Sequence, residues 1–273
     1  MKNKVKKMKD LSCVIASDGR KALINTVKSL LRGSVIPAEI IICIPNGHKL
    51  TDKIFYLNNN IKIIQSRKGQ VIQRLNGFKK TKRNIVLQID DDLKISRKCV
   101  QILYKTLKSK GKGNVIGPNL INNNKDIFKF KNWKNYKCGD ITNFGEGVPV
   151  ENFCFKRNLI QTSWIPGGCV IQFKKDIIMK NFFPFNSKAY NEDLINSFLR
   201  QKKKINHYVC KSAKCYLVNH SDVIEFKNIV NYLKSRIYFL KISKKLNFKF
   251  YIFILILIPK LVIKRILNFI KII

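Results

Sequence analysis

Acidic side chains are scarce in this chain. It carries 16 Asp and Glu residues against 54 Lys and Arg residues, which gives a formal net charge of +38 over 273 residues. The deficit excludes an electrically neutral surface and favours an anionic partner: nucleic acid, an anionic membrane face or a phosphorylated substrate. Lys, Asn and Ile are all abundant, as a biased genome would also make them, so charge alone does not choose among these partners.

The tail lacks an apolar run of the roughly 20 residues that a membrane-spanning helix needs. Its uninterrupted run, residues 251–258, ends at Pro259 and Lys260. On a helical projection five polar residues of the tail fall within a sector of roughly 100°; they are Lys249, Lys260, Lys264, Asn268 and Lys271. This pattern favours a helix lying in the membrane interface. A helix packed in a dimer interface and a short tilted spanning helix are the alternatives.

No apolar run of the signal-peptide type follows the basic residues 1–10. We therefore expect a cytoplasmic protein, held peripherally on the inner face of the cell membrane by its tail, with its eight cysteines reduced and mostly buried. Four potential zinc ligands, His207, Cys210, Cys215 and His220, have a spacing that fits no standard zinc motif. A structural zinc is therefore the lesser alternative for them.

Strands and helices alternate over the first 121 residues. Apolar runs at residues 11–17, 39–44, 60–65 and 84–89 predict strands, and helical spacing predicts helices at 21–32, at 69–82 and after Ser96. The strands are continuously apolar rather than alternating, which is typical of a parallel sheet covered by helices on both faces. The fold class is therefore α/β, with a Rossmann-like, mostly parallel sheet.

Three consecutive aspartates, Asp90, Asp91 and Asp92, directly follow the fourth apolar run. Like charges this close raise one another's pKa unless a cation intervenes, and a divalent metal that bridges a diphosphate is the usual reason for such a cluster. Ligands of parallel sheets bind beyond the carboxyl ends of the strands, where Asp18 and Asn46 also fall. The alternative interpretation is that the aspartates form a solvated turn. The convergence of polar residues at the strand ends argues against that interpretation.

The alternation breaks down after residue 121. Residues 122–143 are polar and aromatic without a clear period, and they predict an excursion or loop. We expect one or two strands within 151–163, a strand at 169–173, a short helix at 174–181, a helix that opens at 191–193 and an amphipathic helix at 228–245. These boundaries divide the chain into a basic segment (1–10), a main domain (11–222, with halves 11–121 and 122–222) and C-terminal helices (223–273).

Several motifs, in their order and intervals, resemble those of the family 2 glycosyltransferases, inverting enzymes of the GT-A fold. Residues 17–20 (SDGR) look like the opening nucleotide-contacting loop, and residues 69–77 (GQVIQRLNG) are similar to the G-x3-QRN-x-G helix. The aspartates at 90–92 correspond to the DxD or DDD element. Residues 166–169 (PGGC) look like the glycine-rich acceptor segment, and residues 191–193 (NED) with Arg200 match the E-D…R element. The resemblance covers roughly residues 11–220.

The resemblance implies a role for each of these residues. Asp193 would be the catalytic base, with Glu192 as the alternative, and a single base with in-line displacement implies inversion. Asp92 would bind a divalent cation, Mn²⁺ or Mg²⁺, on the donor diphosphate, with His220 as a second ligand. The implied donor contacts are Ser17, Asp18, Arg20, Asn46, Arg74, Asp90 and Asp91, and the implied acceptor contacts are Trp164, Gly167 and Gly168.

The implied activity is transfer of a sugar from a nucleotide-diphosphate-sugar to a glycan or polyprenyl-diphosphate-linked acceptor, in cell-surface polysaccharide synthesis. No nucleic acid is then expected as a partner. Two departures from the family pattern concern the donor: the second strand ends in Asn46 rather than an aspartate, and Leu75 separates Arg74 from the next Asn.

Three other readings stay open. A nucleotidyltransferase of related fold would need a glycine-rich, basic first loop, and residues 17–20 are too short for one. A basic nucleic-acid-binding protein would leave the aspartates and the Glu192–Asp193 pair unexplained. A non-catalytic, transferase-like binding module is the third reading, and Asn46 in place of an acid favours it.

Overall fold

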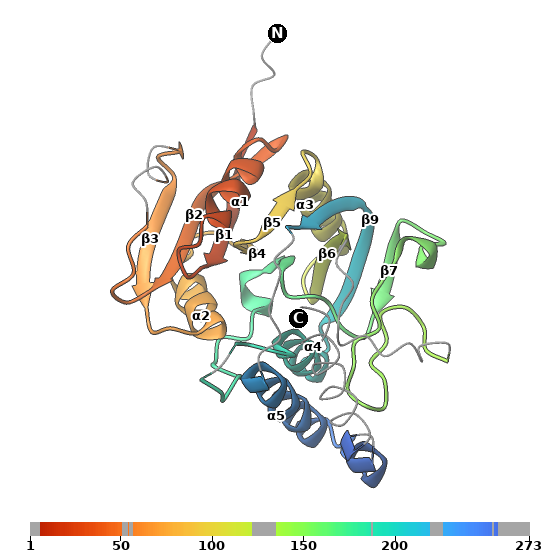
Figure 1. Ribbon diagram of the computed structural model, residues 1–273. Helices are drawn as coiled ribbons and strands as arrows, with labels where there is room; N and C mark the ends of the chain where they lie inside the picture. Colours follow the sequence, from red (N-terminus) through yellow and green to blue (C-terminus); the bar gives the residue numbers. More distant parts are fainter. Residues whose placement is uncertain are drawn as a thin grey trace, which may run out of the picture.

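A single large sheet forms the centre of the molecule (Figure 1). The computed structural model describes residues 6–50, 54, 57–121, 135–186, 188–218, 226–252 and 254–255. The strands run in the spatial order β3-β2-β1-β4-β8-β6-β9-β5, and β7 pairs with β9 at the side. Their bounds are β1 Lys6–Ala16, β2 Val35–Pro45, β3 Ile61–Ser66, β4 Ile85–Asp90, β5 Leu93–Ile95, β6 Asn114–Ile121, β7 Leu159–Thr162, β8 Cys169–Phe173 and β9 Asn206–Leu217.

The first half of the sheet is parallel, as its continuously apolar strands predict. Strands β3, β2, β1 and β4 all pair in parallel. The second half is mixed, because β8 runs antiparallel to both β4 and β6, and β9 is parallel to β6 but antiparallel to β5 and β7. The mixed α/β fold class is thereby confirmed, and the antiparallel pairs are what the second half adds to the expected parallel sheet.

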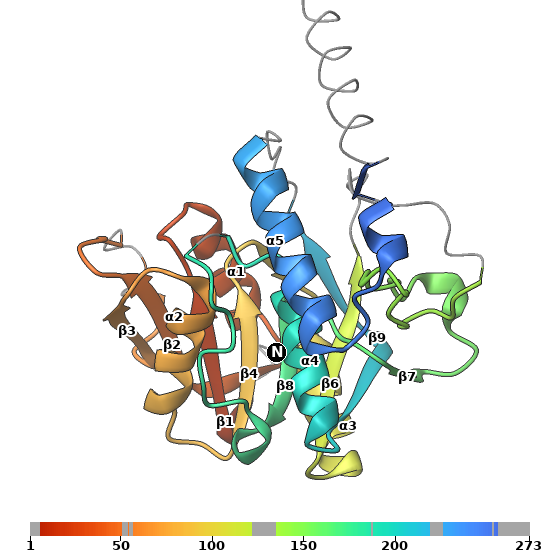
Figure 2. The ribbon, with the colours of Figure 1, turned by 90° about the horizontal axis from the view of Figure 1, so that it is seen from below.

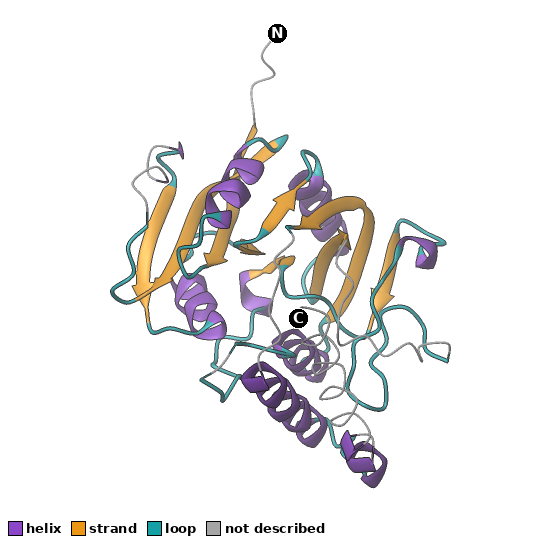
Figure 3. Ribbon diagram, viewed as in Figure 1, coloured by secondary structure: helices purple, strands orange, loops and turns teal. Residues whose placement is uncertain are grey.

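Helices cover both faces of the sheet (Figures 2 and 3). Their bounds are α1 Ala22–Leu31, α2 Gln70–Lys80, α3 Cys99–Lys110, α4 Glu192–Lys202 and α5 Phe226–Ile242. Alternate residues of each strand point to opposite faces of the sheet. On one face they pack against α1 and α3 in the main core. On the other face Val14, Ile41 and Val86 pack against α2. A third cluster joins α2, α4 and α5 through Val71, Leu194 and Phe239.

Two expectations about elements need correction, and one is confirmed. The short helix expected at 174–181 is only the 3₁₀ turn η3 (Lys174–Asp176). The strand β7 confirms the one or two strands expected within 151–163, where a second 3₁₀ turn, η2 (Asn152–Cys154), also lies. The sequence did not predict the strand β5, because a strand of three residues is too short to show a recognisable hydrophobic pattern. The division of the chain into domains stays a prediction.

The cysteines correct another expectation. Cys138 and Cys154 form a disulfide, whereas the other six are free and buried. The expectation of eight reduced thiols is therefore wrong for this pair.

The chain continues beyond α5 as a second helical segment at residues 248–252 and 254–255. Within the described part of the chain no helix is both long enough and apolar enough to cross a bilayer. Residues 256–273, which carry most of the expected interface helix, lie outside the described residues.

Candidate active site

The carboxyl ends of β1, β2 and β4 meet at one edge of the sheet. Ala16 at the end of β1 is in register with Cys43 on one side and Asp90 on the other. The loop after β1 and the aspartates after β4 are therefore neighbours, although about 70 residues separate them in sequence. At this edge the Ser17 hydroxyl donates to Asp91 Oδ2 at 2.5 Å.

Asp91 is the innermost of the three aspartates. It is buried, and Arg20 Nη2 lies 2.6 Å from its Oδ1. Its backbone carbonyl accepts a hydrogen bond from Thr26 Oγ1 at 2.9 Å. Because Ser17 and Arg20 engage both carboxylate oxygens, Asp91 fixes the loop after β1 rather than facing an open site.

Asp90 and Asp92 are more accessible than Asp91. The side chain of Asp90 accepts from Arg74 Nη2 at 2.5 Å and from Gln70 Nε2 at 3.2 Å through the same oxygen, Oδ1. Asp92 Oδ2 lies 4.0 Å from Arg20 Nη2, and the Asp92 side chain is partly exposed. Of the three consecutive aspartates, these two are thus the ones that a ligand can reach.

Asp18 and Asn46 lie at the same edge and are exposed. The Asp18 carbonyl is 3.2 Å from His48 Nδ1, and the Asn46 amide N–H donates to the Ser66 carbonyl at 2.9 Å. Their backbones are thus tied to neighbouring loops, and their side chains face outward.

Gln73 was not singled out from the sequence, although it belongs to the same helix motif as Arg74. It is buried, and its Nε2 donates to the carbonyls of Ser17 and Cys43 at 2.9 and 2.8 Å. Those two carbonyls lie at the ends of β1 and β2, so one amide ties both strand ends to α2. A glutamine beside the arginine of the motif was the only signal in the sequence.

Arg74 connects the edge of the sheet at which β1, β2 and β4 end to the start of α4. Its guanidinium is buried and forms ion pairs with Asp90 through Nη2 and with Glu192 through Nη1, each at 2.5 Å. These two acids are about 100 residues apart in sequence. A buried guanidinium between two carboxylates fixes both of them in position, because its planar fork allows little reorientation.

The two glycines before β8 allow this close packing. A methyl group on Gly167 would lie 2.5 Å from Glu192 Oε1, and one on Gly168 would lie 3.3 Å from Asp90 Oδ2. The Gly167 carbonyl also accepts a hydrogen bond from the Gln88 side chain, and the Gly168 carbonyl accepts from the Asp90 amide at 2.7 Å. Glycine is therefore required at 167 because the Glu192 carboxylate occupies the space of a side chain.

Glu192 and Asp193 open α4, but their environments differ. Glu192 is buried against Arg74, whereas Asp193 is partly exposed and accepts the Leu194 amide N–H at 2.9 Å. Desolvation of the Asp193 carboxylate by burial, and then the negative charge of Glu192, raise the pKa of Asp193 from 3.8 to about 7. A carboxylate with a pKa near neutrality is chemically suited to accept a proton as a general base, whereas the Glu192 carboxylate is occupied by its ion pair with Arg74.

Arg200 and His207 lie behind this pair. Both are buried, and burial lowers the pKa of Arg200 to about 10 and that of His207 to about 3. The Arg200 charge lowers the His207 pKa further. His207 is consequently neutral at physiological pH.

The described residues contain no group of three His, Cys, Asp or Glu side chains placed to bind a metal ion. His220, the expected second metal ligand, lies outside the described residues. Mg²⁺ is commonly bound by one or two carboxylates together with substrate phosphates and water. The partly exposed Asp92, directly after β4, suits that type of binding.

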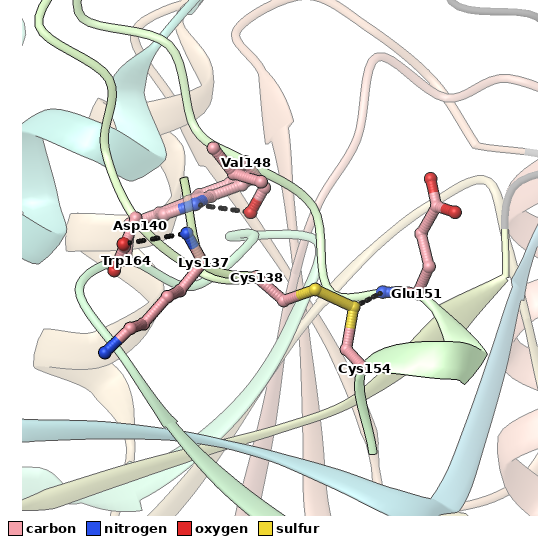
Figure 4. The surroundings of a disulfide bond; sticks show 7 residues. All are labelled: Lys137, Cys138, Asp140, Val148, Glu151, Cys154 and Trp164. Atoms are coloured by element: carbon pink, nitrogen blue, oxygen red, sulfur yellow. Dashed lines mark hydrogen bonds between the residues drawn. A yellow bond between two sulfur atoms is a disulfide. The ribbon is translucent and has the colours of Figure 1, made fainter. Parts of the chain in front are cut away.

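Trp164 packs rather than projecting into the site. Its ring covers Gly147 so closely that a methyl group there would lie 2.3 Å from it, and its Nε1 donates to the Val148 carbonyl at 3.1 Å (Figure 4). Nearby, the Cys138–Cys154 disulfide joins the end of the excursion, where Cys138 lies, to η2 (Figure 4). Trp164 thus holds the segment 147–148 against the start of the glycine-rich turn.

Comparison with known proteins identifies one family. The model for "Glycosyl transferase family 2" matches residues 13–167, which is more than half of the chain. No curated protein matches the sequence. Solved structures that resemble the fold include GalNAc-T7 crystallised with UDP, GalNAc and Mn²⁺ (16% identity, TM-score 0.62) and TarS of S. aureus (14% identity, TM-score 0.56).

The two alignments cover 85% and 84% of this chain but only 48% and 39% of the respective structures. The chain therefore spans about half the length of GalNAc-T7 and less than half of TarS. At such low identity these structures establish the fold alone.

Proposed function

The chain belongs to glycosyl transferase family 2, and from that premise we propose that it transfers a sugar from a nucleotide-diphosphate-sugar to an acceptor hydroxyl with inversion. The observation that carries the proposal is the buried Arg74, which ties the donor-side Asp90 to Glu192 while Asp193 remains accessible beside it. A nucleotidyltransferase or a nucleic-acid-binding protein gives no reason for this arrangement.

Asp193 acts as the base in the proposed reaction. It accepts the proton of the acceptor hydroxyl while the hydroxyl oxygen attacks the anomeric carbon from the face opposite the diphosphate. The bond from the anomeric carbon to the diphosphate oxygen breaks, and the nucleoside diphosphate leaves with the electron pair. Glu192, paired with Arg74, orients the start of α4 and does not itself take the proton.

Asp90 and the exposed Asp18 and Asn46 contact the donor in this proposal, and Asp91 positions the loop that carries Asp18. Asp92 would hold a divalent cation, which when bound would neutralise charge on the leaving group. The Mn²⁺ and UDP in the GalNAc-T7 crystals support this assignment. Asn46 accepts or donates a hydrogen bond without charge, so it leaves the choice of nucleotide open.

A thermal-shift experiment tests the donor and metal together. With Mn²⁺ and a nucleotide-sugar at about 100 times its Kd, binding adds about 2.7 kcal/mol, which raises the Tm by roughly 5–10 °C. We expect Asp92→Asn to lose the part of the shift that requires Mn²⁺. Asp10→Asn, the same charge change far from the donor edge, where β1, β2 and β4 end, should keep it. A full Mn²⁺-dependent shift in Asp92→Asn would contradict the metal assignment.

The helical segment after α5 supports a membrane-bound acceptor. Its exposed apolar side chains, Phe248, Tyr251, Ile252 and Leu255, recur at i, i+3, i+4 and i+7, and Phe248 and Leu255 are 76% and 71% exposed. Phe250 points inward and is buried. We infer that this face enters an anionic membrane on the cytoplasmic side, where a polyprenyl-diphosphate-linked acceptor of cell-surface polysaccharide synthesis would reside.

Vesicle sedimentation tests the membrane contact. The protein should sediment with phosphatidylglycerol vesicles at low salt and less so at high salt, because screening weakens the attraction between lysines and lipid. The double variant Phe248→Glu/Leu255→Glu should remain in the supernatant. Phe153→Glu is the matched control, since Phe153 is 80% exposed on η2, outside this segment. Equal sedimentation of the double variant and the control would contradict the inference.

A further inference from the structure

A cavity of about 330 Å³ lies between residues 136–141, α4 and α5. Its volume is within the range of small-molecule sites in proteins. None of its lining residues belongs to the donor edge or to the Glu192–Asp193 pair. They are Tyr136, Asp140, Ile141, Ser163, Phe198, Gln201, Phe239, Ser243 and Lys245.

The lining combines aromatic rings with uncharged hydrogen-bonding groups. Tyr136, Phe198 and Phe239 supply ring surfaces, and the charged members are one acid, Asp140, and one base, Lys245. In a chain of net charge +38, a charge-balanced lining is a poor match for phosphate, which would require several cations. A neutral polyhydroxylated ligand fits better, because its C–H faces pack on the rings while its hydroxyls meet the polar groups.

The walls of the cavity are held in place. On one side the Cys138–Cys154 disulfide anchors the excursion, and Asp140 accepts the Lys137 amide through Oδ2 at 3.1 Å (Figure 4). On the other side the Phe198 and Phe239 rings meet edge to face, with centroids 6.2 Å apart. A preorganised lining loses little conformational entropy on binding.

Arg236 of α5 holds the backbone at residue 144, directly after the excursion. It is buried, and its Nε donates to the Phe144 carbonyl at 2.5 Å. Gln201 Nε2 donates to the Ser163 carbonyl at 2.8 Å, and the amide oxygen takes no part in that bond. Gln201 can therefore accept from a ligand while it remains anchored.

The cavity shares α4 with the proposed base. Phe198 and Gln201 follow Asp193 by five and eight residues on this helix, which places them about 8 and 12 Å farther along its axis. We propose that this cavity binds a neutral sugar residue of the acceptor glycan, beyond the sugar that reacts. The assignment to the acceptor rests on the proposed function; the existence of a carbohydrate site does not.

Saturation-transfer difference NMR without any donor tests the site. The probes are maltotriose, cellotriose, mannotriose and chitotriose, and we expect at least one of them to give a saturable signal with the full chain. Ser243→Trp, which fills the cavity, should raise its Kd at least tenfold. Gln201→Leu, which removes a hydrogen-bonding group at nearly constant volume, should raise it by roughly three- to tenfold.

Two controls make the outcome decisive. Lys241→Trp places the same side chain on an exposed position of α5 outside the lining, and it should bind the trisaccharide as the unaltered chain does. Asp193→Asn should also keep binding. The proposal is overturned if no trisaccharide gives a signal, or if Ser243→Trp and Gln201→Leu both bind normally. Trisaccharide binding by a chain that responds to no nucleotide-sugar would keep the site and overturn the proposed function instead.

Discussion

Asp193→Asn should lower kcat by about 10²–10⁴-fold, the usual contribution of a general base, with little change in donor affinity. The reason is that the side chain is the accessible carboxylate at the start of α4, whereas its neighbour Glu192 is buried and paired with Arg74. The measurement is initial-rate transfer with the nucleotide-sugar identified by thermal shift. Asp10→Asn serves as the control for loss of one negative charge.

The same residue sets the expected pH dependence. A base with a pKa of about 7 must lose its proton before it can act, so kcat/KM should rise about tenfold per pH unit below pH 7 and level off above it. The rise should be absent from the residual rate of Asp193→Asn. A flat profile between pH 5.5 and 8 in the unaltered enzyme would contradict the assignment.

The stability of Asp193→Asn shows whether the variant is inactive because it has lost its base or because its fold is damaged. The pKa of Asp193 is about 7 in the folded chain and about 3.8 when unperturbed, so between these values the folded state binds more protons than the unfolded state. The free energy of unfolding therefore falls as pH rises through this window and is constant above it. Asp193→Asn removes that decline, so this variant should have a higher Tm than the unaltered chain at pH 8 while being nearly inactive.

The sequence predicts the donor edge well because strand ends are local features. The fourth apolar run stops at Asp90 and the first stops at Ser17, and parallel pairing then places both at one edge. The resemblance to the family likewise led to Gly167 and to the Glu192–Asp193 pair. What it did not show is that the three aspartates differ: Asp91 is enclosed by Ser17 and Arg20, which only the three-dimensional register reveals.

Contacts between distant segments could not be predicted from local patterns. Arg74 and Glu192 are separated by 118 positions, and nothing in the period of either helix indicates that their side chains meet. The Cys138–Cys154 disulfide joins the aperiodic excursion to η2, and the excursion has no strand or helix pattern that limits the pairing. The cavity against α4 has the same origin, since residues 136–141 line it together with residues of α4 and α5 that come much later in the chain.

Arg74→Met should be the most damaging single change to the fold near the site. It leaves Asp90 and the buried Glu192 without their shared cation, and breaking a buried ion pair in this way typically costs about 3–5 kcal/mol. Arg74→Lys keeps the charge but cannot bridge two carboxylates with one planar group, so it should fold with a smaller loss of stability and still transfer sugar poorly. Urea denaturation with Arg67→Met, an exposed arginine at the same end of the sheet, provides the comparison.

The pH profile separates the electrostatic role of Arg74 from its role in packing. The Glu192 charge raises the pKa of Asp193, whereas the Arg74 charge lowers it. Glu192→Gln should therefore move the acidic limb of kcat/KM to lower pH, and Arg74→Met, measured below its unfolding transition, should move it to higher pH. If the ion pair had a purely structural role, both variants would react more slowly, but the acidic limb of kcat/KM would stay at the same pH. Displacements of opposite sign require that Asp193, Glu192 and Arg74 form one electrostatic unit, with Asp193 as the group that titrates.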